Sequence, residues 1–426
     1  MKDIALVVYY HKNNKFSFNA LIGALDSLER FNDLKIVFFS SKNDLIQGIN
    51  DIIGKYEKVI LGISFFTTQI WEIHELITTL RRKYDNDLVI IAGGPHPTGD
   101  PVGTLKIGCD IAVVGEGEDS LIELLQKINN GEDISNVKGI GYIGTNGNYN
   151  YTGKRDLIDL NKYPPFPLKN RRFGALEITR GCPFVCFFCQ TSYIAGTTPR
   201  HRSIKSICKY VQIMKEENLT DIRFITPNAL CYGSPDGKSL NLPKLEELLV
   251  KVKEIVAPEG RIFFGSFPSE VRPEHVTKET LDLITTYANN DNIIIGAQSG
   301  SQKILDSCHR GHSIEDVYTA VDLTLKAKLK VNVDFIFGLP NETSEDVKLT
   351  IHVMEDLVKK GARIHAHSFI PLPMTPFANE PAMKLDENIQ KSLKSSILGS
   401  SVFGEWKKQE EMALNIAKYL KTRNIN

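Results

Sequence analysis

Residues 177–193 read EITRGCPFVCFFCQTSY and place three cysteines, Cys182, Cys186 and Cys189, within eight positions. They come directly after a short apolar run, Ala175–Thr179, that predicts a strand. In a reducing compartment, a cluster of this kind indicates a metal site rather than a disulfide framework. The other four cysteines stand alone in the sequence, as small core residues usually do: Cys109, Cys208, Cys231 and Cys308.

Three thiolates on one short loop suit one face of an iron–sulfur cube. Complete cysteine ligation of a cube takes four residues, so three leave one iron open for chemistry. Structural zinc is the alternative, but it usually takes four ligands in two closely spaced pairs. The nearest fourth ligand is His201, and no second pair accompanies it. The spacing therefore favours the iron–sulfur interpretation.

The rest of the second half alternates strands with helices. Five of the six strand candidates are followed by a plausible helix, such as Leu242–Ile255 or Ser344–Lys360. Six repeats are too few for a closed eight-fold barrel, so we expect an open, partial barrel with its site at the carboxyl ends of the strands. The predicted strands are Ala175–Thr179, Asp221–Thr226, Arg261–Ser266, Asn292–Ala297, Val331–Phe337 and Arg363–Phe369.

The first half also alternates, with near-continuously apolar strands that predict a doubly wound parallel sheet covered on both faces. Expected strands are Ile4–Tyr10, Leu34–Ser40, Lys58–Phe65, Leu88–Gly93 and Ile111–Gly115. The fold class is thus α/β, in four parts: a doubly wound domain over 1–130, a hairpin and Pro-rich linker over 131–172, the partial barrel over 173–375 and a helical extension over 376–426.

Composition bounds the function. The 51 basic and 51 acidic residues of the 426 cancel, which argues against nucleic acid or an anionic membrane as the main partner. No apolar run reaches the roughly 18 residues of a membrane span, and the first residues read as a strand, not a signal peptide. We expect a cytoplasmic protein.

The Cys-x3-Cys-x2-Cys spacing, with Phe188 before the last cysteine, resembles the radical S-adenosylmethionine (SAM) enzymes, and the later strand ends match that family in order. The resemblance implies a 4Fe-4S cluster on Cys182, Cys186 and Cys189 as the catalytic and metal-binding residues. It also implies a SAM site built from Phe188, Thr226, Asn228, Gln298, Ser299, Ser301, Arg310, Phe337 and Gly338. The second strand departs from the family, because Thr226-Pro227-Asn228 replaces its usual Gly-Gly-Glu-like pattern.

Three loops stand out in the first domain, each at the end of a predicted strand: residues 62–68 (GISFFTT), 93–98 (GGPHPT) and 115–118 (GEGE). They resemble the cobalamin-binding domain that precedes many radical SAM domains. In this domain no Gly-x-Gly-x-x-Gly follows the first strand, where a dinucleotide fingerprint belongs, and no Gly-Lys-Ser/Thr indicates a phosphate loop. A flavodoxin-like domain that binds another nucleotide, or nothing, stays an alternative. The chain lacks the Asp-x-His-x-x-Gly cobalt motif, and His96 between two prolines is favoured as a turn residue over a ligand. The implied cobalamin-binding residues are Ser64, Phe65, Thr67, Thr68, Gly93, Gly94, Pro95, His96, Thr98, Gly115, Glu116, Gly117 and Glu118.

The resemblance implies an enzyme that transfers a methyl group from SAM, by way of methylcobalamin, to an unactivated carbon or phosphorus, with electrons from a donor such as ferredoxin or flavodoxin. A cobalamin-dependent cyclase or rearrangement enzyme is the alternative. A methylthiotransferase is less favoured, because the extra three-cysteine cluster of that family is missing from the first domain. A non-catalytic cobalamin sensor is also less favoured. Substrate-side candidates at the barrel mouth are Tyr193, Arg202, Glu270, His365 and His367.

Overall fold

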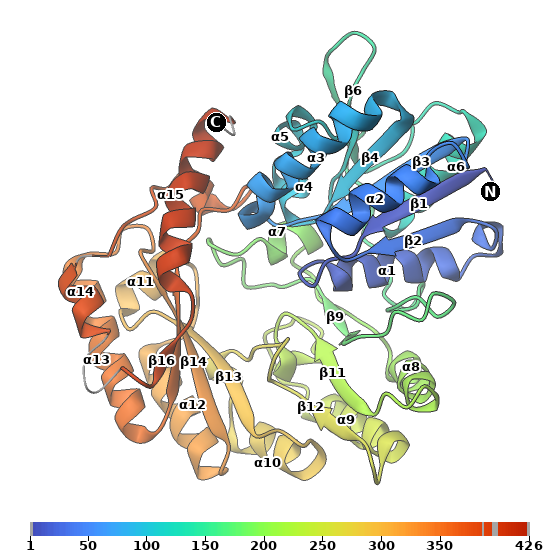
Figure 1. The fold of residues 1–426 in the computed structure, drawn as a ribbon. Coiled ribbons are helices and arrows are strands. Elements are labelled where there is room, and N and C mark those ends of the chain that lie inside the picture. The colour runs from blue at the N-terminus through green and yellow to red at the C-terminus, as the bar shows by residue number, and fades with distance from the viewer. Residues whose placement is uncertain (1–2, 386, 394–398, 424–426) are drawn as a thin grey trace. The chain divides into compact units, whose positions relative to one another are not determined.

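The computed structural model describes residues 3–385, 387–393 and 399–423. The chain divides into two compact units (Figure 1). The first comprises Met1–Gly174 with Leu372–Met374 and Arg423–Asn426, and the second comprises Ala175–Pro371 and Thr375–Thr422. Each unit is described by itself.

The first unit is built on a seven-stranded sheet in the order β2-β1-β3-β4-β5-β6-β7. Strands β1 to β5 are parallel, which confirms the doubly wound prediction. Their order, 2-1-3-4-5, reverses direction between β1 and β3, and ligands of such sheets bind beyond the carboxyl ends of the strands at this point. The strands are β1 (Ile4–Tyr9), β2 (Lys35–Phe39), β3 (Lys58–Ser64), β4 (Leu88–Gly93) and β5 (Ile111–Val113).

The predicted hairpin forms, and it continues the sheet instead of standing apart as linker. Its strands, β6 (Ile140–Ile143) and β7 (Tyr149–Tyr151), are antiparallel, and β6 pairs with β5. The loop expected after β4 is also partly wrong, because Pro95 starts a short helix, where its missing N–H costs nothing. The helices of this unit are α1 (Lys15–Asp26), α2 (Lys42–Ile52), α3 (Ile70–Tyr84), α4 (Pro95–Gly99), α5 (Pro101–Lys106) and α6 (Glu118–Asn130).

The second unit is an open partial barrel, as predicted. A three-stranded sheet, β12-β11-β8, and a four-stranded sheet, β13-β14-β15-β16, are parallel throughout. A parallel bridge between Val271 and Ile295 joins them. The strands are β8 (Leu176–Glu177), β11 (Asp221–Ile225), β12 (Arg261–Phe263), β13 (Asn292–Gln298), β14 (Lys330–Phe337), β15 (Arg363–Ser368) and β16 (Val402–Phe403). Strand β9 (Thr179–Arg180) pairs instead with β10 (Arg200–His201), antiparallel.

Helices follow the strands and lie against them (Figure 1). Those of the second unit are α7 (Thr191–Ala195), α8 (Ile204–Glu216), α9 (Leu242–Val256), α10 (Lys278–Tyr287), α11 (Gln302–Ser307), α12 (Ile314–Lys326) and α13 (Ser344–Lys360). The C-terminal extension adds α14 (Glu387–Ser392), strand β16 and α15 (Trp406–Thr422), and α15 packs against β15. In the described part of the chain, no helix is long and apolar enough to cross a membrane.

Candidate functional site

The three-cysteine loop is held by backbone hydrogen bonds from several directions. Gly181 has a φ of +94°, and a Cβ there would lie 2.4 Å from the Thr198 carbonyl oxygen, so only glycine fits. Cys182 N–H donates to Gly196 O at 3.0 Å, and Cys189 N–H donates to Cys186 O at 3.0 Å. These bonds fix the loop without using any of its thiols.

The loop also contains a strained residue. Val185, a β-branched residue, has a φ of +52°, a left-handed conformation that such residues rarely adopt. Strain of this kind persists where the surrounding structure over-determines the backbone, and it concentrates at functional sites. No sequence pattern marks it, so sequence analysis missed this residue.

The three thiols lie close enough to interact but too far apart for one small ion. Burial raises the pKa of Cys182 and of Cys189, and the charges of neighbouring cysteines in the loop raise both further. However, among the described residues, the three sulfurs are not a group whose ligand atoms all lie within 4.8 Å of one another. Tetrahedral zinc with Zn–S bonds of about 2.3 Å would need sulfurs only about 3.8 Å apart. The three sulfurs therefore do not have the spacing of ligands around a single zinc ion.

Two buried arginines approach Cys186. Arg310 Nη1 lies 3.6 Å from its sulfur and Arg272 Nη1 lies 4.0 Å from it. Arg310 also donates from Nη2 to Gly296 O at 2.7 Å, while its buried Nε has no hydrogen-bond partner. The predicted SAM-side arginine therefore contacts the cysteine loop and keeps one donor for a ligand. Arg272 was not identified from the sequence.

Asn228 supplies the complementary acceptor. Its Nδ2 donates to His275 Nδ1 at 2.8 Å, and its buried Oδ1 has no partner. A pocket lined by Cys182 and Phe184 reaches Asn228. Thr226, by contrast, uses its hydroxyl to donate to Asn228 O at 3.2 Å. Of the two residues carried over at this strand end, Asn228 has the free ligand-binding atom.

The end of β13 supports the site mainly through its backbone. Gln298 is buried with a φ of +77°, where the pairing with β14 shifts register. The hydroxyls of Ser299 and Ser301 are occupied by α13, since Ser299 Oγ lies 3.3 Å from Thr350 Oγ1 and Ser301 donates to Asp346 at 2.7 Å. Any SAM contact here must therefore use the main chain or Gln298.

The end of β14 forms the other predicted SAM-side turn. Phe337 is buried, and Gly338 has a φ of +74° that suits glycine. Gly338 N–H donates to Glu342 Oε2 at 2.6 Å, and Glu342 Oε1 is buried without a partner. Phe188 of the cysteine loop packs against a nearby apolar cluster that includes Leu339.

Burial raises the pKa of Glu342 to about 7. Because the unfolded-state pKa is near 4.5, the folded state binds more protons, and stability is lost as pH rises through about 7. The loss in the free energy of unfolding amounts to about 3 kcal/mol, at roughly 1.4 kcal/mol per pKa unit.

We expect Glu342→Gln to be more stable than wild type at pH 8 and about equal to it at pH 5, as measured by urea unfolding of the second unit. Glu345→Gln, on an exposed side chain, is the control, and parallel curves for both variants would contradict the prediction.

The substrate-side candidates separate into two groups. Tyr193 is half-buried, with its hydroxyl 3.4 Å from Val185 O, whereas Arg202 is buried and donates to Glu177 O at 3.1 Å. The Arg202 side chain therefore stabilises the barrel, and little of its surface is exposed to a substrate.

The remaining candidates, Glu270, His365 and His367, gather around Asp334. Glu270 is solvent-exposed, yet it is surrounded by enough protein to raise its pKa to about 7, with Asp334 adding to the effect of desolvation.

In the first unit, the predicted loops after β3, β4 and β5 are tied to one another. Gly94 has a φ of +95°, and a Cβ there would lie 2.7 Å from Ser64 Oγ. Phe65 N–H donates to Gly93 O at 3.2 Å, and Gly115 N–H donates to Thr98 Oγ1 at 3.1 Å. A Cβ added at Gly115 itself would have no neighbouring atom within 4 Å. The glycine-rich edge is thus a firm surface against which a flat group can lie.

The side chain of His96 supports this surface from the interior of the first unit. Its side chain is fully buried, its Nδ1 lies 3.0 Å from Thr67 Oγ1, and its ring stacks on Phe65 at 5.2 Å. Burial lowers its pKa to about 4. The side chain offers no exposed nitrogen to cobalt, and His96 lies in the short helix α4 rather than in the turn favoured from the sequence. Asn14, which the sequence analysis missed, binds Tyr9 O and Ser64 O at 2.9 Å each and joins the ends of β1 and β3.

The acidic candidates after β5 are also structural. Glu116 and Glu118 are buried, and Glu116 Oε2 accepts from Ile158 N–H at 2.9 Å. Pro95, Gly117 and Thr68 are half-buried, so together with the glycines they offer backbone and hydroxyl groups to a ligand.

Two family models match the chain. The Radical SAM superfamily matches residues 176–354, and the B12 binding domain matches residues 19–125. These matches confirm the predicted cofactors: a 4Fe-4S cluster, SAM and cobalamin.

Among curated relatives, an uncharacterised methyltransferase of Pyrococcus horikoshii is 26% identical over 341 residues, 76% of this chain and 70% of that protein. A tRNA-2-methylthio-N(6)-dimethylallyladenosine synthase of Petrotoga mobilis is 28% identical over 291 residues, 66% of this chain and 63% of that protein.

Solved structures share the fold. The radical SAM methyltransferase TsrM from Kitasatospora setae, with cobalamin and a 4Fe-4S cluster bound, aligns with a TM-score of 0.70 at 17% identity, over 90% of this chain and 75% of that one. The cobalamin-dependent radical SAM enzyme OxsB aligns with a TM-score of 0.65 at 18% identity, over 94% and 57%. At these identities the likeness establishes the fold alone.

Proposed function

This chain belongs to the radical SAM enzymes that carry a B12-binding domain, and from that premise we propose that it transfers a methyl group from SAM to a carbon or phosphorus atom of its substrate. The observation that carries the proposal is the loop of three thiols with a spare donor on Arg310 and a spare acceptor on Asn228 beside it. This donor set suits a cluster with one open iron and an amino-acid ligand next to it.

Each residue then has a defined task. When bound, the cluster supplies an electron, SAM supplies the radical and the methyl group, and cobalamin carries the methyl group. Cys182, Cys186 and Cys189 hold three irons. Arg310 Nε donates to the SAM carboxylate and Asn228 Oδ1 accepts from the SAM amino group. Electrons come from an external one-electron donor such as a ferredoxin or flavodoxin.

The first unit argues against methylthio transfer, the second candidate function. Methylthiotransferases would need a further three-cysteine cluster there, but residues 1–174 contain one cysteine, Cys109. Its thiol is buried, and burial raises its pKa strongly, so it is a poor metal ligand. Cyclisation or rearrangement without methyl transfer remains the alternative that the experiment must separate.

The test is anaerobic reconstitution with iron, sulfide and cobalamin, followed by SAM and a strong reductant. Mass spectrometry measures 5′-deoxyadenosine and S-adenosylhomocysteine with and without cobalamin. We expect both products, and we expect S-adenosylhomocysteine to require cobalamin. Deoxyadenosine alone would favour cyclisation or rearrangement, and neither product from protein with a full cluster would contradict an enzymatic role.

A further inference from the structure

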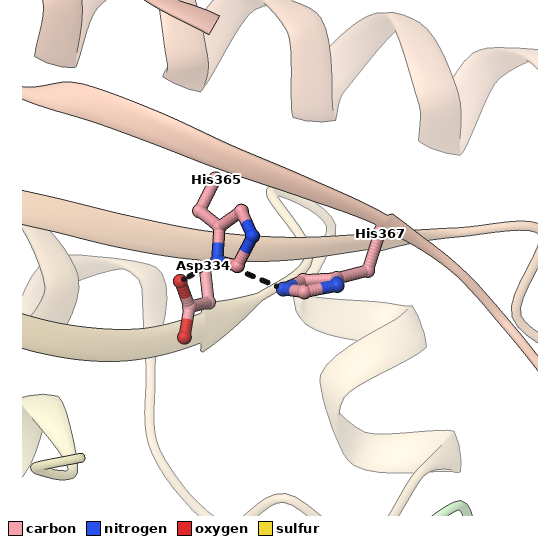
Figure 2. Close-up of side chains that lie close together, drawn as sticks. All are labelled: Asp334, His365 and His367. Atoms are coloured by element: carbon pink, nitrogen blue, oxygen red, sulfur yellow. Dashed lines mark hydrogen bonds and ion pairs between the residues drawn. The ribbon is translucent and has the colours of Figure 1, made fainter. Parts of the chain in front are cut away.

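Asp334, His365 and His367 bring three metal-ligand atoms together within the second unit (Figure 2). Asp334 Oδ1 lies 3.1 Å from His365 Nδ1, which lies 3.1 Å from His367 Nε2. All three atoms lie within 4.8 Å of one another, and no other group of three such residues in the described chain does so. The sequence places His365 and His367 among the substrate-side candidates but assigns Asp334 no role.

Strand geometry produces the convergence. Asp334 on β14 and His365 on β15 are paired in register, and His367 lies two residues further along β15 on the same face. The ring of His365 stacks on Phe403 of β16 at 4.7 Å and 8°, which fixes its plane. Asp334 is buried, while the His365 side chain is 34% exposed, so the cluster is anchored on one side and open on the other.

The hydrogen bonds around His367 orient its ring within the cluster. Gln409 Oε1 accepts from Ser368 N–H at 2.9 Å, which orients its amide so that Nε2 faces His367 Nδ1 at 3.3 Å. His367 Nε2 therefore faces His365 Nδ1, which also faces Asp334 Oδ1. The three atoms converge on one point, where a cation would take all of them as ligands.

We propose that Asp334, His365 and His367 bind a divalent transition-metal ion, separate from the iron–sulfur cluster. Two histidines and one carboxylate on one face are the ligand set of open-sided Fe²⁺ sites. Two of the three separations between ligand atoms are 3.1 Å, which matches neighbouring corners of an octahedron with bonds of about 2.2 Å. In a tetrahedron they would require bonds of about 1.9 Å, shorter than the roughly 2.0–2.1 Å of zinc–histidine bonds. The site therefore suits Fe²⁺ or Mn²⁺.

Two neighbours complete the arrangement. Glu270, whose pKa is raised by burial and by the charge of Asp334, lies close enough to Asp334 to be a fourth candidate ligand. A metal held by His367 Nε2 would leave Nδ1 facing Gln409, which lies 3.3 Å away where outer-shell partners of metal-bound histidines lie. The open positions are available to an oxygen- or nitrogen-bearing group of the substrate.

The probe is Mn²⁺, which is distinguishable from the cluster iron. Full-length protein with its cluster reconstituted is freed of loose metal with a chelator and titrated with Mn²⁺, while electron paramagnetic resonance measures the free ion. We expect one Mn²⁺ per chain in the wild type, and at least about tenfold weaker binding in His365→Ala and in the nearly isosteric Asp334→Asn.

The control is His352→Ala. His352 lies 3.4 Å from Asp356 on the exposed side of α13, so it is a histidine–carboxylate pair without the third ligand. This variant should bind Mn²⁺ as the wild type does. Cluster absorbance and circular dichroism report folding in every variant. No bound Mn²⁺ in the wild type, or unchanged binding in folded Asp334→Asn, would overturn the metal site. Both results leave the SAM cleavage assay unaffected, so failure here is separable from failure of the proposed function.

Discussion

Cys186→Ser is expected to reduce SAM cleavage by at least about a hundredfold and to prevent assembly of a complete cluster. Cys186 is the thiol that both Arg272 and Arg310 approach, and it is almost fully buried. Even outer-shell partners of a metal ligand change affinity or activity by about 10- to 100-fold, so loss of a ligand itself should cost more. Iron content, cluster absorbance and 5′-deoxyadenosine formation measure the effect.

Cys308→Ala is the matched control. Cys308 is also buried, and it contacts the same loop, but through its backbone oxygen, which accepts from Phe187 N–H at 3.0 Å. Alanine keeps that bond, so the cluster and its activity should survive. If Cys186→Ser retained a full cluster while Cys308→Ala lost it, the assignment of ligands would be wrong.

Much of the fold was predictable because its strands are continuous and apolar. The predicted Leu88–Gly93 coincides with β4, and the predicted Ser344–Lys360 coincides with α13, which starts at a capping box on Thr343 and ends at Gly361. Such signals are local, so a single sequence suffices to read them. The same holds for the cysteine loop, whose spacing alone indicates a cluster.

Pairing between distant segments was not predictable in this way. Strand β16 has two residues, too few to show a period, and it forms only because β15 offers an edge. Asp334 stood in the predicted strand without a role, since its contact with His365 depends on the register of two strands. Ser299 and Ser301 looked like ligand contacts, but α13 supplies their partners from about fifty residues away. Local patterns carry none of this information.

Arg310→Lys should leave the cluster intact but weaken SAM binding and slow its cleavage by about 10- to 100-fold. Lysine keeps the positive charge near Cys186 but loses the planar fork that also reaches Gly296 O and leaves Nε free. A hydrogen bond to a charged group contributes about 1.5–3 kcal/mol, which corresponds to this range of affinity. Equilibrium binding of SAM and the rate of 5′-deoxyadenosine formation separate affinity from turnover.

Arg272→Lys provides the contrast that tests this reasoning. Arg272 also approaches Cys186, at 4.0 Å, but its other donors already bind Glu274 and Arg310 O, and its guanidinium lies 3.5 Å from the centre of the Phe184 ring. Loss of these contacts should lower the melting temperature of the second unit and leave the SAM affinity of folded protein within a few-fold of the wild type. The two variants differ in whether the lost donor faces protein or ligand. Equal losses of SAM affinity in both would mean that charge alone near Cys186 matters and that the spare Nε of Arg310 has no role in holding SAM.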